Sequence, residues 1–279
     1  MMSFILLMPV EDKKCWQAIV TENKIKTKLK AGGRVFGTWS MLASPSVMNA
    51  IGHAGLDFVI IDMEHGPMSF ETAESQIYAT ESSGCTPIIR LGEGNELTIL
   101  HALEIGVKAL LVSHVSTAQE ALRIVQATKY FPEGNRGLSP FTRNHGYSDI
   151  ELAPKLRYAN DQLFVGILVE GEEGIRNLEE IAQVPGLDLI YLGLYDISQA
   201  VGIPGELTHP KVLKLVKECV KLIEAHRRVA GSIAWDKNYL QFLFESGFRF
   251  ISYRVDCAIL RDGFDTARHW YEELLKGQR

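Results

Sequence analysis

The sequence predicts an α/β fold, specifically a (β/α)8 TIM barrel, on three observations. Eight short apolar runs recur along the chain, and they lack the polar alternation of strands with one face in water. Such runs are typical of strands buried on both faces, as in a parallel sheet. Segments with helical periodicity separate the runs, and 279 residues are close to the roughly 250 that such a barrel needs. A doubly wound open sheet is the alternative.

The predicted strands cover residues 34–40, 57–62, 86–90, 108–115, 163–170, 187–193, 229–235 and 248–255. Four helices are predicted from their periodicity at 44–55, 69–84, 116–130 and 209–226. Gly55 suits the end of the first helix, because glycine readily adopts the left-handed conformation found there. Glu71 and Glu74 in the first turns of the second helix suit the helix dipole, and Pro210 suits the start of the fourth.

Composition favours one globular domain that acts on small molecules. Apolar residues make up 46% of the chain and charged residues 23%, which is near the average for globular proteins. The formal net charge of -5 argues against general nucleic-acid binding, because no basic excess is available to neutralise phosphates.

The N-terminus and the cysteines indicate in which cellular compartment the protein is expected. The apolar run in "MMSFILLMPV" is too short to span a membrane and has no basic residues before it, so it is a poor signal peptide. We expect residues 1–30 to form an extension before a barrel domain at 31–279, and we expect no membrane contact. The four cysteines contain no CxxC pair, which favours a reduced, cytoplasmic protein.

Polar residues follow the apolar runs and define a candidate site. Asp62, Glu64 and His65 follow the second run and Arg90 follows the third. His114 follows the fourth, Glu170 the fifth and Asp196 the sixth. In a barrel, the carboxyl ends of all strands meet on one face, where the active site lies. We therefore expect these side chains to converge there.

Glu170 and Asp196 are the most informative pair. Each follows an apolar strand, so each carboxylate would be partly removed from water, which is unfavourable without a compensating cation. Two carboxylates with open positions suit Mg²⁺ or Mn²⁺, which keep several water ligands and accept substrate oxygens. The alternative is that Glu170 pairs with an arginine or caps the next helix.

Arg90 and His65 suit two further roles. An arginine at a strand end offers a permanently charged fork for a carboxylate or a developing enolate oxygen. It could equally form a buried ion pair with Asp62 or Glu64, and both interpretations can hold together. His65 can exchange protons near neutral pH; as a lone histidine, its alternative is an ordinary surface residue.

A long irregular segment, "FPEGNRGLSPFTRNHGYSD" at 131–149, lies between the fourth and fifth strands. A connection of this length and composition is more often functional than not.

These motifs resemble the HpcH/HpaI aldolase family, metal-dependent pyruvate aldolases of the phosphoenolpyruvate/pyruvate barrel superfamily. The resemblance runs from about Gly32 to Ala267. The matching stretches are "FGTW", "DMEHGP", "PIIR", "ALLV", "ATKYFPEGNRG", "GLYDIS" and the glutamate of "ILVE".

The resemblance implies a role for several residues. Glu170 and Asp196 fall on the ligands of the divalent metal, His65 on the catalytic base and Arg90 on the residue that stabilises the enolate. Glu104 in "HALEIG" falls on an acid that raises the basicity of the histidine. Backbone N–H groups around Leu194, Tyr195 and Asp196, at the start of a helix, would bind the carboxylate of a pyruvate unit.

The chain departs from the family at positions that line the site. Leu168 stands where a glutamine is common, Tyr195 replaces a small residue, and Ser113-His114 replaces a Pro-Met pair. A different, more acidic acceptor would be favoured by Tyr195, His114 and Arg143, and by Arg254 near the last strand.

The resemblance implies a carbon–carbon lyase that uses pyruvate or oxaloacetate with an aldehyde or keto acceptor. A condensing, citrate-synthase-like enzyme and a barrel that binds a keto acid without turnover are the alternatives. The family also implies a homo-oligomer, as a dimer that exchanges its last helices or as a hexamer. The segment 261–276 is a predicted terminal helix whose apolar side chains could cover a partner subunit or the chain's own core equally well.

Overall fold

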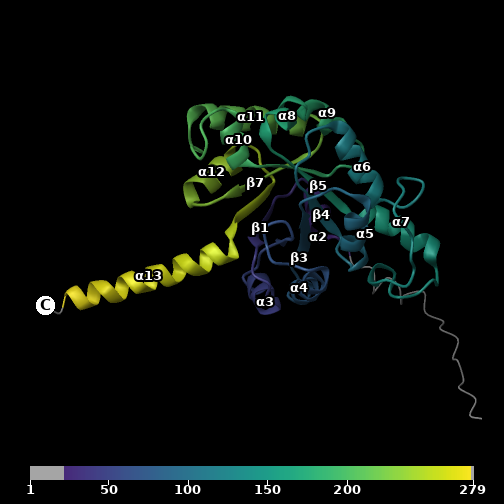
Figure 1. Ribbon diagram of the computed structural model, residues 1–279, viewed down its shortest axis with the longest axis horizontal. Helices are drawn as coiled ribbons and strands as arrows, with labels where there is room; N and C mark the ends of the chain where they lie inside the picture. The colour runs from purple at the N-terminus through teal and green to yellow at the C-terminus, as the bar shows by residue number, and fades with distance from the viewer. Residues whose placement is uncertain (1–21, 278–279) are drawn as a thin grey trace, which may run out of the picture.

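The computed structural model describes residues 22–277 and contains a closed barrel of eight parallel strands (Figure 1). Each strand pairs with its neighbours in chain order and β8 pairs with β1, so the predicted (β/α)8 barrel is confirmed and the open sheet is excluded. The strands are β1 (Val35–Ser40), β2 (Phe58–Asp62), β3 (Thr86–Leu91), β4 (Ala109–Val112), β5 (Phe164–Val169), β6 (Leu189–Leu192), β7 (Val229–Ala234) and β8 (Phe250–Val255). All eight lie within or almost within the apolar runs.

The strands are apolar throughout because each faces a core on both sides. One core fills the barrel, where the Phe58 and Phe250 rings stack with their centroids 4.1 Å apart. The other core lies between the strands and the surrounding helices and includes Ile61 and Ile167. Burial on both faces explains the absence of polar alternation.

The surrounding helices are α3 (Pro45–His53), α4 (Phe70–Ser82), α5 (Glu96–Glu104), α6 (Ala118–Thr128), α7 (Leu152–Gln162), α8 (Gly171–Arg176), α9 (Leu178–Gln183), α10 (Leu194–Ala200), α11 (Pro210–Ala225) and α12 (Lys237–Glu245). The four helices predicted from periodicity are α3, α4, α6 and α11. Ser69 caps α4 through its side chain, and Gly55 has a φ of +82° just after α3. Thr117 and Glu120 form a reciprocal capping box at α6.

Helix α2 (Lys24–Lys30) closes the N-terminal end of the barrel. Ile25 and Leu29 belong to the core inside the barrel. The Nζ atom of Lys26 donates to the carbonyl oxygen of Leu163 at 2.6 Å and lies 3.2 Å from Asp188. The last part of the predicted extension at 1–30 is therefore built into the barrel, while its residues 1–21 lie outside the described part of the chain.

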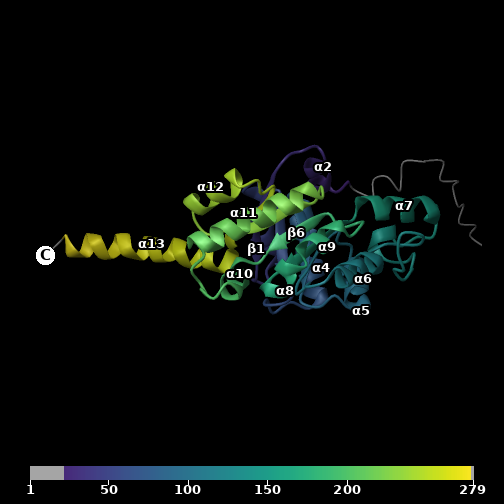
Figure 2. The ribbon, with the colours of Figure 1, turned by 90° about the horizontal axis from the view of Figure 1, so that it is seen from above.

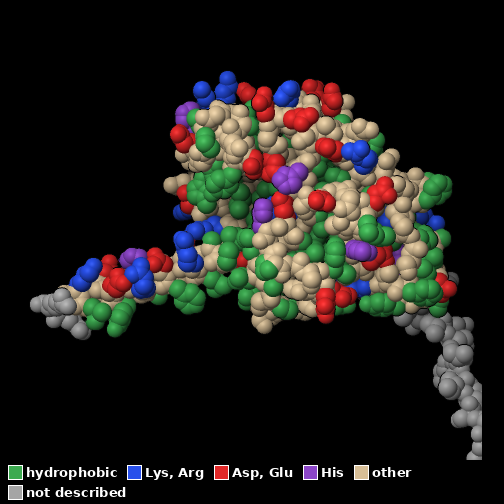
Figure 3. All heavy atoms as spheres, viewed as in Figure 1, with side chains coloured by type: hydrophobic (Ala, Val, Ile, Leu, Met, Phe, Trp, Pro, Cys, Tyr) green, Lys and Arg blue, Asp and Glu red, His purple; other side chains and the backbone are tan. Residues whose placement is uncertain are grey.

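The last helix, α13 (Asp256–Lys276), projects away from the barrel (Figures 1 and 2). It begins five residues before the predicted start, at the end of β8. Trp270 is 64% exposed and Leu274 is 70% exposed, and hydrophobic side chains follow the lower edge of the helix in Figure 3. The helix does not cover its own core, so that alternative is wrong within this chain. Between residues 22 and 277, no helix combines the length and the apolar character needed to cross a membrane.

The long segment after α6 is held by buried polar contacts. It contains the short helix η1 (Arg143–His145). The Tyr130 hydroxyl and the Nε2 atom of His145 are 2.8 Å apart, and Lys155 donates to the carbonyl oxygen of His145 at 2.9 Å. Burial lowers the pKa of His145 to about 4, so this imidazole is neutral near pH 7.

Candidate active site

A cavity of about 520 Å³ opens at the carboxyl ends of the strands, and most of the predicted site residues line it. Acidic and histidine side chains gather near the middle of the face shown in Figure 3. The lining residues are Trp39, Met41, Asp62, Glu64, His65, Arg90, His114, Leu168, Glu170, Tyr191, Gly193, Leu194, Tyr195, Asp196, Ile233 and Val255. The expected convergence of residues from β2 to β6 therefore occurs at one place.

Arg90 is held rigidly beside the cavity. Its Nε and Nη2 atoms donate to the two carboxylate oxygens of Asp62 at 2.9 and 2.5 Å. Its Nη1 atom lies 3.3 Å from Glu64, and its guanidinium stacks over the Trp39 ring at 4.7 Å. The ion pair considered as an alternative is thus formed, and Arg90 faces the cavity as well.

Asp62 also shapes the turn that carries His65. Its Oδ1 atom accepts from the backbone N–H groups of Glu64 at 3.0 Å and of His65 at 3.1 Å. One buried carboxylate therefore fixes both the guanidinium and the backbone of the candidate base. The His65 ring itself is 63% exposed and reaches 3.7 Å from Glu64, so it stands at the mouth of the cavity.

Glu170 and Asp196 lie close enough for their charges to interact. Burial and, next to it, the negative charge of Asp196 raise the pKa of Glu170 to about 7. Glu170 occupies the residue before α8 but makes no side-chain cap, and its ion-pair partner is His114. Within the described residues, Glu170 therefore neither pairs with an arginine nor caps the next helix, which were the two alternatives for this residue.

The space around this acid pair suits a small cation. A Cβ atom at Gly193 would lie 3.0 Å from the Oε2 atom of Glu170, so the missing side chain keeps that oxygen accessible. Within residues 22–277, no group of three or more histidine, cysteine, aspartate or glutamate side chains is arranged to hold a metal. Two carboxylates alone fit an ion that takes its remaining ligands from water and substrate, as Mg²⁺ does.

His114 bridges two acids across the mouth of the cavity. Its Nε2 atom is 2.9 Å from Glu64 and its Nδ1 atom is 2.6 Å from Glu170. Its backbone has a φ of 59°, in the left-handed region. Burial acts to raise the pKa of Glu64, but its contacts with Ser113, Arg90 and His114 outweigh this, so the pKa lies below its ordinary value.

The start of α10 faces the same cavity. Gly193 precedes the helix without a side-chain cap, and Leu194, Tyr195 and Asp196 form the first turn. The backbone N–H groups of a first turn have no partner within the helix. Binding of a carboxylate by these groups stays a prediction.

Three expected residues do not join the cavity. Glu104, at the end of α5, pairs with Arg136 at 2.9 Å and does not contact His65 within this chain. Arg254 has a φ of 49° and pairs with Asp262 of α13, while Arg143 pairs with Glu81. Each of the three side chains forms an ion pair with an oppositely charged residue outside the cavity. The sequence does not reveal these partners.

Residues that sequence reasoning missed form the floor of the cavity. Trp39 donates from Nε1 to Ser252 at 2.8 Å, and the hydroxyls of Tyr191 and Ser252 are 2.7 Å apart. Trp39 lies in the stretch "FGTW", but nothing in the sequence indicates that its ring supports Arg90. Tyr191 lies inside an apolar strand, so its position gives no signal of a polar contact.

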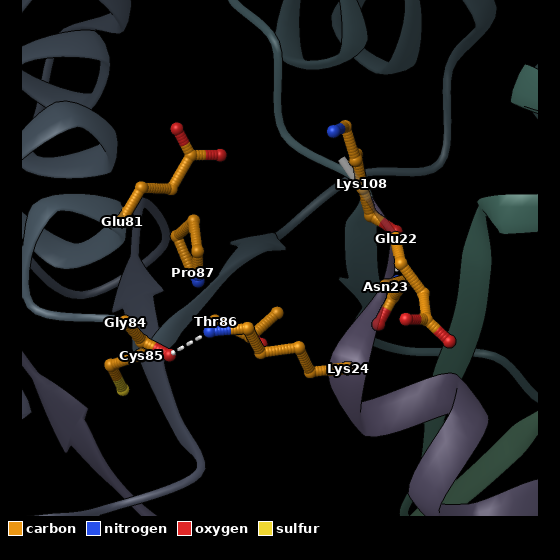
Figure 4. Close-up of a pocket in the computed structure, with 9 residues that line it drawn as sticks. All are labelled: Glu22, Asn23, Lys24, Glu81, Gly84, Cys85, Thr86, Pro87 and Lys108. Atoms are coloured by element: carbon orange, nitrogen blue, oxygen red, sulfur yellow. Dashed lines mark hydrogen bonds between the residues drawn. The ribbon is translucent and has the colours of Figure 1, made fainter. Parts of the chain in front are cut away.

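A second cavity, of about 130 Å³, lies at the opposite end of the barrel (Figure 4). It is lined by Glu22, Asn23, Lys24, Glu81, Gly84, Cys85, Thr86, Pro87 and Lys108. Lys24 reaches across it to the carbonyl oxygen of Gly84 at 3.0 Å. Two glutamates, Glu22 and Glu81, line this cavity, but its described lining residues include no histidine and no arginine.

The fold and the larger cavity together define a TIM-barrel enzyme with an acidic site at the carboxyl ends of its strands. The chain belongs to the HpcH/HpaI aldolase/citrate lyase family, whose profile matches residues 35–262.

Relatives in sequence and structure agree with this family. The chain is 32% identical over 251 residues to a hydroxypyruvate/pyruvate aldolase of Roseobacter denitrificans, covering 89% of this chain and 97% of the relative. A family protein from Burkholderia cenocepacia has a similar structure, with a TM-score of 0.84 and 26% identity over 90% of this chain and 99% of its own. The citrate synthase SbnG matches with a TM-score of 0.82 and 26% identity, covering 91% and 98% of the two chains.

Replacing Asp62 tests its role in holding Arg90. We expect Asp62→Asn to lower the free energy of unfolding by about 3 kcal/mol, because it leaves a buried guanidinium without its charged partner. Urea denaturation measures this change. Asp161→Asn is the control, since its partner Lys30 lies 3.5 Å away in an exposed pair and such pairs contribute about 1 kcal/mol or less. Equal small losses in both variants would contradict the role of Asp62.

Proposed function

We propose that this enzyme is a divalent-metal-dependent aldolase that cleaves or forms 4-hydroxy-2-keto acids through a pyruvate enolate. The observation that carries the proposal is the arrangement of Glu170, Asp196, Arg90 and His65 around one cavity. Membership of an aldolase and citrate lyase family supports it.

Glu170 and Asp196 would hold Mg²⁺ or Mn²⁺. When bound, such an ion supplies a Lewis acid for the keto and carboxylate oxygens of the pyruvate unit. The raised pKa of Glu170 supports this role, because two adjacent carboxylates without a cation repel each other.

The other residues would orient the pyruvate unit. The N–H groups at the start of α10 bind its carboxylate, and Leu168 and Trp39 pack against its carbon atoms. Arg90 donates to the oxygen that becomes negative as the enolate forms. Asp62 keeps the guanidinium in place before charge develops, which avoids reorganisation during the reaction.

His65 would move the proton. In the cleavage direction, it accepts the proton of the C4 hydroxyl, directly or through a water molecule, while the C3–C4 bond breaks. The electron pair of that bond passes into the enolate, and the aldehyde leaves. Protonation of the enolate at C3 then yields pyruvate, and the reverse sequence forms the carbon–carbon bond.

Condensation is the second candidate, and the likeness to citrate synthase SbnG favours it. A barrel that only binds a keto acid is the third. Pyruvate release from a panel of 4-hydroxy-2-keto acids, with and without Mg²⁺ or Mn²⁺, distinguishes cleavage from binding. Citrate formed from oxaloacetate and acetyl-coenzyme A, without pyruvate release from the panel, would favour condensation.

The acid pair gives the first test of this proposal. We expect Glu170→Gln and Asp196→Asn each to lower metal-stimulated turnover by at least 100-fold, because one charged ligand is lost. Circular dichroism should show an unchanged fold. Glu172→Gln is a matched control, since that exposed residue pairs only weakly with Arg176 at 3.4 Å. Near-normal activity in either ligand variant would refute the assignment.

His65 gives the second test. We expect His65→Ala to lower aldol cleavage at least tenfold more than oxaloacetate decarboxylation. Loss of CO₂ needs no base at a hydroxyl group, whereas both reactions pass through the same enolate. Steady-state rates of the two reactions in one preparation measure the difference, and equal losses would contradict the role of His65.

We also propose that a second copy of the chain covers α13, so that the enzyme is a homo-oligomer. Seven of the large apolar side chains that α13 carries are exposed, and a monomer would leave them in water. They are Ile259, Leu260, Phe264, Trp270, Tyr271, Leu274 and Leu275.

Charge placed on this helix tests the oligomer. We expect the double variant Trp270→Glu/Leu274→Glu to elute as a smaller species than the wild type in size-exclusion chromatography with light scattering, because charged side chains cannot be buried in an apolar interface. Glu273→Gln controls for a change on the same helix. A wild-type monomer, or an unchanged mass in the double variant, would contradict this proposal.

A further inference from the structure

A further cavity of about 270 Å³ adjoins the candidate active site. It lies between the segments that follow β3 and β4, and it is lined by Gly92, Glu93, Gly94, Ser113, His114, Val115, Glu120, Arg123 and Ile124. His114 lines both this cavity and the larger one.

The imidazole of His114, called the wall below, is held at both ends. The His114 ring spans from Glu64 to Glu170 through contacts of 2.9 and 2.6 Å. Glu64 in turn backs onto Gly92, where an added Cβ atom would lie 2.9 Å from its Cγ atom. The backbone of His114 is left-handed, with a φ of 59°. Removal of the imidazole would take away the side chain of a residue that both cavities share.

The adjoining cavity is polar on several sides. Arg123 and Glu93 line it with exposed side chains, and Glu120 is fixed there by the N–H groups of Ser116 and Thr117 at 2.9 and 3.0 Å. Carboxylate and guanidinium groups suit a ligand rich in hydroxyl groups better than an alkyl chain.

We propose that His114 sets the length of the acceptor and that the cavity behind it would accommodate the far end of a hydroxylated aldehyde. This inference rests on the proposed aldolase function. The imidazole narrows the space beside His65, so the wild-type enzyme favours short acceptors. Removal of the ring admits acceptors of four or more carbons, whose hydroxyl groups reach Arg123 and Glu93.

Aldol addition of pyruvate to glycolaldehyde and to erythrose, with Mn²⁺ present, tests the proposal. His114→Asn shortens the side chain, and asparagine tolerates a positive φ. We expect the ratio of kcat/KM for erythrose to that for glycolaldehyde to rise at least tenfold. A ratio within one variant is insensitive to a general loss caused by disturbing Glu170.

Two control variants separate wall removal from simple enlargement. His114→Gln keeps a long side chain with a donor, and its ratio should stay within threefold of the wild type. Val255→Ala enlarges the site cavity at a residue that does not border the adjoining one, and its ratio should also be unchanged. A tenfold rise in Val255→Ala, or no rise in His114→Asn, would overturn the inference.

A binding measurement covers the case in which His114→Asn has no turnover. The 2-hydroxy analogues of the two addition products, with five and seven carbons, are titrated calorimetrically into the Mn²⁺-loaded enzyme. The same tenfold gain for the longer analogue in His114→Asn supports the inference, and its absence overturns it. If the wild type forms no product from pyruvate and either aldehyde, the proposed function fails instead, and the binding ratio still decides whether His114 separates the cavities.

Discussion

The paired contact between Arg90 and the carboxylate of Asp62 is the constraint on which the site depends. Both residues are buried at the ends of neighbouring strands, and β2 and β3 are in register at this pair. The same carboxylate accepts two backbone N–H groups from the turn that carries His65. The carboxylate of Asp62 therefore sets the relative positions of the Arg90 guanidinium, the candidate base His65 and Glu64. Removing one partner of a buried charged pair is strongly destabilising, because the other charge is then left uncompensated.

The fold could be predicted because the barrel places the same demand on all its strands. Each must be apolar on both faces, so each leaves a short run that is visible without any knowledge of its neighbours. Helices were harder to predict. Those with strong caps and amphipathic faces, such as α6, follow from local sequence, whereas the short α8, α9 and α10 depend on packing around the strand ends.

The candidate site was predictable to the extent that strand ends converge. That rule brings Glu170, Asp196, Arg90 and His65 together, although their catalytic roles stay predictions. It fails where a local partner diverts a side chain, as Arg136 does for Glu104 and Asp262 for Arg254. It also cannot show that His114 contacts two acids at once, because those contacts join segments 50 and 56 residues apart and depend on an unusual backbone angle.

The closure of one barrel end by α2 leaves the opposite end as the route to the larger cavity. Trp39 and Tyr191 lie buried at its floor, whereas His65 and His114 are exposed at its mouth. For the proposed reaction, the keto acid must then enter first and depart last, since the aldehyde sits above it. Product-inhibition patterns would reveal such an ordered sequence, and random exchange of the two ligands would show that a second passage exists.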